Sequence, residues 1–196
     1  MSFSFRPLFL VLVSSSFVVA CYTAPRVPGG DVTTTHSASL SERSPIDVAV
    51  APIQNDSGNA SLPASWLRES FWRGLVSRRY SPLALEQVDR QVTDAAYRPG
   101  ALDEQAVLLI KVAKWDDSLW SVNNTLQFTL TAKLVDPADP SNVMWSGKLD
   151  QRYSVSDDSE HFATIEGLMR HACDGIATQV LAALPPHDPK PGRVSK

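Results

Sequence analysis

The chain has 196 residues, a formal net charge of −3 and 43% hydrophobic residues. This length is sufficient for one domain with a substantial core, and the 20% of charged residues argues against a chain without fixed structure. The acidic excess argues against a nucleic-acid-binding protein, and no stretch of the sequence reaches the roughly 20 apolar residues that span a bilayer.

Residues 1–20 are predicted to be a signal peptide. Arg6 precedes an uncharged run rich in Leu, Val and Phe, which has the length of a signal-peptide core. The run ends in Val18-Val19-Ala20-Cys21, which resembles a bacterial lipobox. This resemblance implies cleavage before Cys21, acylation of its sulfur and new amino group, and, because Tyr22 and not Asp follows, sorting to the outer membrane. An ordinary secretory signal followed by a chance cysteine is the alternative.

Residues 21–45 are predicted to be the acylated cysteine and a flexible tether. Pro, Gly, Ser and Thr dominate this segment, and its apolar residues follow no period. As a random coil, about 24 residues would span on the order of 27 Å. The expected α/β domain covers residues 46–184, and residues 185–196 form a polar tail.

The domain is predicted to be α/β, or α+β, with the order β-α-β-α-β-β-β-α and a mixed sheet. Its first half contains a buried strand over 46–53, a helix from Ser61 to about Arg79, a short strand over 82–85, a helix over 86–97 and a central strand over 107–113. On the first helix, Leu67, Phe71 and Leu75 form the apolar stripe, while Arg68 is assigned to another face.

A long hairpin and a long helix complete the predicted domain. Apolar and polar residues alternate over 122–135, with Val122 and Leu126 assigned to the inner face, and again over 143–155. A continuous helical stripe over 158–184 predicts that the last helix packs on the sheet.

The residues that could support catalysis do not form a recognisable pattern. Cys173 and His171 are two positions apart on the last helix and therefore point in different directions, so we interpret Cys173 as a core residue. No nucleophile elbow or phosphate loop is present, and the histidines lack metal-ligand spacing. No catalytic residue, metal or cofactor is predicted.

Two tryptophans are candidates for contact with a partner. Trp72 lies off the main stripe of the first helix, and Trp120 lies in the connection between two strands. Exposed aromatic groups there would suggest a partner contact. The alternative is that both tryptophans pack at the edge of the domain.

Three segments resemble small bacterial envelope lipoproteins with a TolB-N-like domain, including the meningococcal surface antigen type and LpoB-like proteins. Residues 48–58 read VAVAPIQNDSG, similar to the VAVLPFxNxSG opening of that group. Residues 79–89 read RYSPLALEQVD, similar to RGYxVxPxxxVD, and residues 132–147 resemble the AxLVDxxxGxxLWxG hairpin. The chain departs from this pattern at Ala51, and its hairpin turn has two prolines and no glycine.

The resemblance implies a non-enzymatic lipoprotein of the cell envelope, anchored by lipid at the outer membrane and facing the periplasm. Its domain would bind a protein partner in a transport, secretion or cell-wall synthesis machine, and it would not bind nucleic acid. Assembly of several copies of the chain is a further option. The alternatives are an LptE-like lipopolysaccharide assembly lipoprotein, which the acidic charge disfavours, and an envelope hydrolase, for which the sequence offers no catalytic pair.

Overall fold

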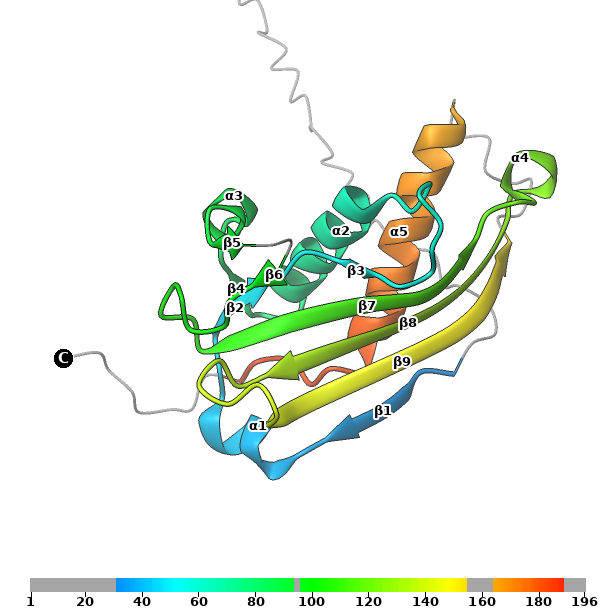
Figure 1. The fold of residues 1–196 in the computed structure, drawn as a ribbon. Helices are drawn as coiled ribbons and strands as arrows, with labels where there is room; N and C mark the ends of the chain where they lie inside the picture. Colours follow the sequence, from blue (N-terminus) through cyan, green and yellow to red (C-terminus); the bar gives the residue numbers. More distant parts are fainter. Residues whose placement is uncertain (1–30, 94–95, 155–163, 189–196) are drawn as a thin grey trace, which may run out of the picture.

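The structure is a computed structural model and describes residues 31–93, 96–154 and 164–188. The predicted signal peptide and Cys21 therefore lie outside the described residues. Its elements follow in chain order (Figure 1): β1 (Thr33–His36), α1 (Ala38–Arg43), β2 (Asp47–Val50), β3 (Gln54–Asn55), α2 (Ala64–Ser77), β4 (Ser81–Pro82), α3 (Leu85–Asp89), β5 (Val92–Thr93), β6 (Ala96–Tyr97), β7 (Ala106–Asp116), α4 (Trp120–Asn123), β8 (Thr125–Val135), β9 (Val143–Ser154) and α5 (Ile165–Ala182).

A seven-stranded mixed sheet has the order β1-β9-β8-β7-β2-β4, with β3 also paired to β7. The strands β7, β8 and β9 form an antiparallel meander, whereas β2 and β3 run parallel to β7. The helices α2 and α5 lie side by side across one face (Figure 1). This confirms the predicted α+β class with a C-terminal helix packed on the sheet.

The main core lies between the sheet and the pair α2–α5. Along β8 the inner face is buried at every second residue from Leu126 to Leu134, as the alternation predicted. A second, smaller cluster covers the opposite face: Ala49 and Val107 belong to it, whereas their neighbours Val48 and Leu108 belong to the main core. The start of β7 is therefore covered on both sides, as expected of a central strand.

The prediction of a flexible tether up to residue 45 is wrong for its described part. Thr33–His36 pair antiparallel with β9, and the Thr35 hydroxyl oxygen lies 2.8 Å from that of Ser146. Leu40 of α1 is buried in the main core. The β-branched threonines suit an edge strand, and the burial of Leu40 stabilises the turn that follows. None of the four β1 side chains is buried, so this strand needs no apolar residues and its polar composition resembles that of a linker.

Two further sequence expectations are corrected near the ends of elements. The helix expected over 86–97 ends at Asp89, and the β5–β6 pair follows, because Val92 and Thr93 favour extended backbone. The strand expected from Val122 begins at Thr125, after Asn124 adopts a left-handed conformation with φ of 51°. Val122 therefore does not reach the inner face and is 77% exposed.

Candidate functional site

The candidate site is a groove of about 580 Å³ between α2 and α3. It is lined by Ser65, Arg68, Glu69, Trp72, Arg73, Ala84, Leu85, Glu86 and Asp89. Its walls combine a half-buried indole with charged side chains of both signs. We call this surface the Trp72 groove.

Arg68 forms the floor of the groove and is buried, although the sequence pattern assigned it to a helix face other than the apolar stripe. Its guanidinium donates hydrogen bonds from Nε and Nη2 to the backbone oxygen of Val50, at 3.0 and 2.8 Å. Its Nη1 forms an ion pair of 2.5 Å with Asp89 of α3. Because a buried charge is costly without partners, these contacts explain why an arginine is accommodated beside the apolar stripe.

Trp72 forms one wall of the groove. Its indole N–H donates a hydrogen bond of 2.9 Å to the backbone oxygen of Leu83, and its ring packs partly against the main core. The remaining surface of the ring is open to the groove. An amphipathic aromatic side chain held in one orientation is a common anchor in protein interfaces.

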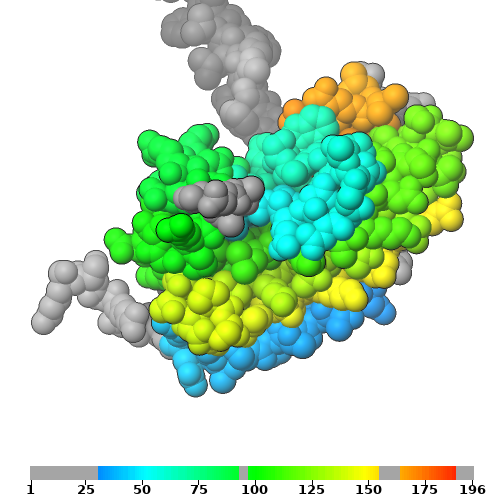
Figure 2. Space-filling model, in the orientation of Figure 1, coloured from blue at the N-terminus to red at the C-terminus, as the bar shows by residue number. Residues whose placement is uncertain are grey.

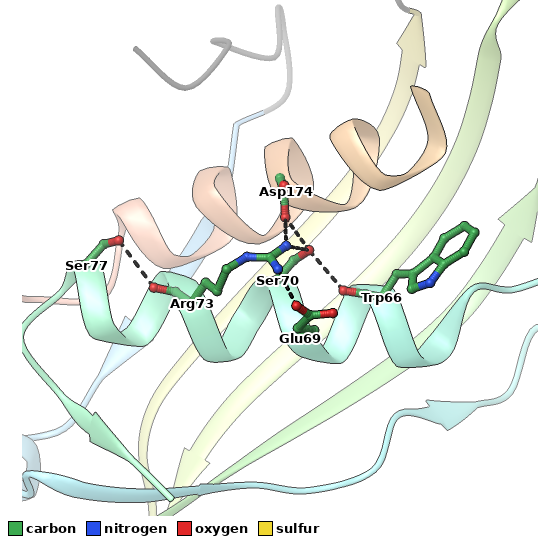
Figure 3. Close-up of polar contacts among 6 residues, drawn as sticks. All are labelled: Trp66, Glu69, Ser70, Arg73, Ser77 and Asp174. Atoms are coloured by element: carbon green, nitrogen blue, oxygen red, sulfur yellow. Dashed lines mark hydrogen bonds and ion pairs between the residues drawn. The ribbon is translucent and has the colours of Figure 1, made fainter. Parts of the chain in front are cut away.

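The outer wall of the groove is fixed by polar contacts between α2 and α5 (Figure 3). Arg73 donates to Glu69 at 2.5 Å and to Asp174 at 2.6 Å, and the hydroxyl of Ser70 donates to Asp174 at 2.5 Å. Partial burial opposes the charge of Arg73, but the two carboxylates outweigh it and raise the pKa of the guanidinium. Arg73 thus stays charged and links the two helices.

Trp120 does not lie in the groove and is buried, with 5% of its surface exposed. Trp120 therefore lacks the exposed apolar surface that would have suggested a contact with a partner. Its indole nitrogen finds no hydrogen-bond partner within the described residues. The indole therefore packs within the domain as part of the main core, which favours the alternative interpretation, whereas Trp72 remains a candidate contact.

Cys173 is fully buried, which confirms its interpretation as a core residue. Burial raises the pKa of its thiol to about 12, with a smaller contribution from the nearby carboxylate of Asp174. A reactive cysteine needs the opposite shift, because the thiolate is the nucleophile. Burial also lowers the pKa of His171 on the same helix.

A second hollow of about 380 Å³ was not anticipated from the sequence. It lies between α1 and the segment after α5, and both His36 and His187 line it. The Tyr80 hydroxyl donates to the backbone oxygen of Pro185 at 2.9 Å, and the Tyr80 ring lies 5.8 Å from that of His187. Two histidines separated by about 150 residues carry no sequence signal that would have joined them.

Neither hollow holds a set of metal ligands. No group of three or more His, Cys, Asp or Glu side chains suited to a metal ion occurs in the described part of the chain. None of the helices in that part is both long enough and apolar enough to cross a membrane.

No family model and no curated protein sequence match the chain. Among solved structures, the PelC dodecamer from Paraburkholderia phytofirmans has a TM-score of 0.51 at 15% identity, covering 79% of this chain and 96% of PelC. A leucine-to-methionine variant of the same dodecamer has a TM-score of 0.53 with the same identity and coverage. At this identity the match establishes the fold.

The lipoprotein GNA1162 from Neisseria meningitidis is also among the similar structures. Its TM-score is 0.46 at 20% identity, and the match covers 71% of this chain and 99% of GNA1162.

Proposed function

We propose that the protein is a lipid-anchored, non-catalytic lipoprotein of the cell envelope, at the outer membrane, and an accessory subunit of an envelope machine. The observation that carries the proposal is the small number of residues between Cys21 and the first described strand. About ten residues later the chain reaches Asp31, and it then forms an edge strand of the sheet. Several acyl chains on Cys21 would therefore hold the whole domain close to the membrane, whereas a single acyl chain would bind only marginally.

Replacement of Cys21 by Ser tests the anchor. The full chain is expressed with its signal peptide, and membranes are separated from the soluble fraction by sedimentation. The wild-type chain and Cys173→Ala should sediment with the membranes, whereas Cys21→Ser should remain soluble and lack the mass of the acyl groups. Cys173→Ala is the matched control because it removes the other cysteine. A Cys21→Ser chain that sediments with the envelope would contradict the proposal.

The Trp72 groove is the surface that we propose for partner binding. It combines the aromatic side chain of Trp72, held in a fixed orientation, with charges of both signs on the helices α2 and α3. The mixed charge suits a folded protein partner better than an extended polyanion, because both signs can be paired across the interface.

Cross-linking of the acylated protein in envelope extracts, with mass spectrometry of the captured proteins, tests this surface. Trp72→Ala should abolish capture of a partner that the wild-type chain retains. Trp66→Ala is the matched control, since Trp66 is also half-buried on α2 but stacks under Arg170, with 4.3 Å between the guanidinium carbon and the ring centroid. Equal capture by both variants would contradict a role for the groove.

Self-assembly is a second proposal, favoured by the fold shared with PelC, whose solved structures are dodecamers. We propose that copies of this chain also associate. Sedimentation velocity of the acylated protein in detergent should show a discrete species larger than a monomer. A monomer at every protein concentration would contradict this proposal.

A further inference from the structure

One end of the domain exposes apolar side chains. Leu119 and Val122, in and beside α4, are 42% and 77% exposed, and Ile165, at the start of α5, is 62% exposed. In the described part of the chain the other exposed large hydrophobic residues are Ile46 and Val76. Leucine, isoleucine and valine grouped on a surface indicate a contact with an apolar environment.

The contacts of α5 place these three residues at the same end of the sheet. Trp145, near the start of β9, donates to the backbone oxygen of Ala183, whereas Tyr153, near the end of β9, lies beside Cys173. The helix therefore runs opposite to β9, and Ile165 lies beyond the end of that strand. The connection containing α4 lies at this same end, and Figure 2 shows it beside the orange first turns of α5. We call Leu119, Val122 and Ile165 the α4 end.

The α4 end is rigidly supported. The buried ring of Trp120 fixes α4 on the sheet, so that the neighbouring Leu119 and Val122 point outward. Just before α4, Asp117 accepts hydrogen bonds from the Asn59 amide at 2.9 Å and the Ser61 hydroxyl at 2.5 Å. These contacts thus hold Leu119 and Val122 in a fixed arrangement.

The chain enters the domain from the side of the α4 end. In the β1–β9 pairing, Thr33 faces Lys148 and His36 faces Trp145, so the described residues before Thr33, which are Asp31 and Val32, lie toward the end of β9. Ten residues beyond Asp31 toward the N-terminus reach Cys21, a distance of at most about 35 Å when extended. The exposed apolar groups therefore lie at the end of the domain toward which the chain runs on its way to the anchor, and Cys21 is close enough in sequence to reach that end.

We propose that the α4 end lies against the membrane to which Cys21 is anchored, with Leu119, Val122 and Ile165 inserted among the lipid headgroups. This inference rests on the proposed lipid anchor. The charges beside the three residues are of both signs, because Arg152 lines the same hollow as Asp116 and Leu119, and Arg170 forms an ion pair with Glu166, so the contact should not depend strongly on the charge of the lipid. Because apolar insertion drives the contact, added salt should not weaken it.

Depth-dependent quenching of a fluorescent label tests the proposal. Val122→Cys and Val76→Cys are each labelled in the acylated full chain and reconstituted into phosphatidylcholine vesicles that contain nitroxide lipids. The native Cys173 is buried and is not labelled in the folded protein. Val76 is the matched control, an exposed valine at the end of α2 where Arg78 contacts the backbone oxygen of Leu184, away from the α4 end.

The label at position 122 should be quenched several-fold more strongly than the label at position 76, with a blue-shifted emission that salt leaves unchanged. Equal quenching at the two positions would overturn the inference. A contact with a second copy of the chain would also overturn the inference. In that case the label at position 122 would be shielded even in detergent without lipid, and Val122→Asp would form a smaller assembly than the wild-type chain. If the unlabelled wild-type chain does not stay with the vesicles, the lipid anchor itself fails.

Discussion

The guanidinium of Arg68 donates two hydrogen bonds to the backbone oxygen of Val50, and thereby joins α2 to the last residue of β2. Val50 is fully buried and Arg68 is 8% exposed, so water does not readily replace this donor. The contact fixes the position of α2 over the sheet and forms the floor of the Trp72 groove.

Replacement of Arg68 by Met should lower the free energy of unfolding by about 2 kcal/mol, because the Val50 oxygen would stay buried without its donor. Asp89→Asn is the control: its side chain is 53% exposed, so loss of the ion pair should cost less than about 1 kcal/mol. Urea unfolding followed by circular dichroism measures both values. Equal effects of the two variants would show that the ion pair, and not the Val50 contact, stabilises this junction.

Alanine substitution at two glycines should have contrasting effects. A Cβ at Gly147 would lie 2.8 Å from the buried ring of Trp145, and we expect a loss of about 1–3 kcal/mol from overpacking. A Cβ at Gly74 would meet only the terminal methyl of Leu181, and the gain in helix propensity of about 1 kcal/mol should offset that clash. Thermal unfolding of both variants measures the difference. A Gly74 variant less stable than the Gly147 variant would contradict this packing argument.

Trp120 should be required for stability through its ring and not through its N–H. Trp120→Ala should cost about 3 kcal/mol because it leaves a cavity under α4. Trp120→Phe should cost much less, since the indole nitrogen has no hydrogen-bond partner among the described residues. Urea titration of the two variants tests this order. A Trp120→Phe protein as unstable as Trp120→Ala would indicate that the N–H is bonded.

The stability of the protein should fall at alkaline pH, partly because of Cys173. The pKa of this thiol is raised from 9.0 to about 12 in the folded state, chiefly by burial. Below pH 9 the thiol is protonated in both states, whereas between pH 9 and 12 it ionises only in the unfolded state, so unfolding becomes easier as pH rises. In Cys173→Ala this decline should begin near pH 10, where Tyr80, with a pKa raised to about 12 by burial, acts in the same direction. Urea midpoints measured across this range test the difference, and identical slopes between pH 9 and 10 would contradict it.

The sequence predicted the elements whose side chains have a regular period. The alternation over 122–135 identified β8 and its buried face, and the apolar stripe of the last helix identified α5. The exceptions were set by tertiary contacts. Arg68 is polar by type but is buried because Val50 and Asp89 supply its partners. Thr33–His36 pair with β9 through backbone hydrogen bonds, which do not require apolar side chains, so their sequence shows no apolar pattern.

The candidate site was predicted only in part. Trp72 was selected because it lies off the apolar stripe, and the structure places it in a groove. The floor and outer wall of the groove depend on Arg68 and Asp174, whose contacts join distant parts of the chain and leave no local pattern. Trp120 was named as a candidate contact on the condition that it is exposed, and the sequence does not show that its indole is buried in the core.

The pairing of β1 with β9 also bears on aggregation. An uncovered strand edge offers backbone groups to other chains, and β9, with 12 residues, is the longest strand that the structure describes in this sheet. Thr33–His36 cover the part of this edge from Trp145 to Lys148 with a short strand of polar side chains. A fragment that begins at Ser37 would leave that edge open, so the segment that follows the membrane anchor also protects the sheet from intermolecular strand pairing.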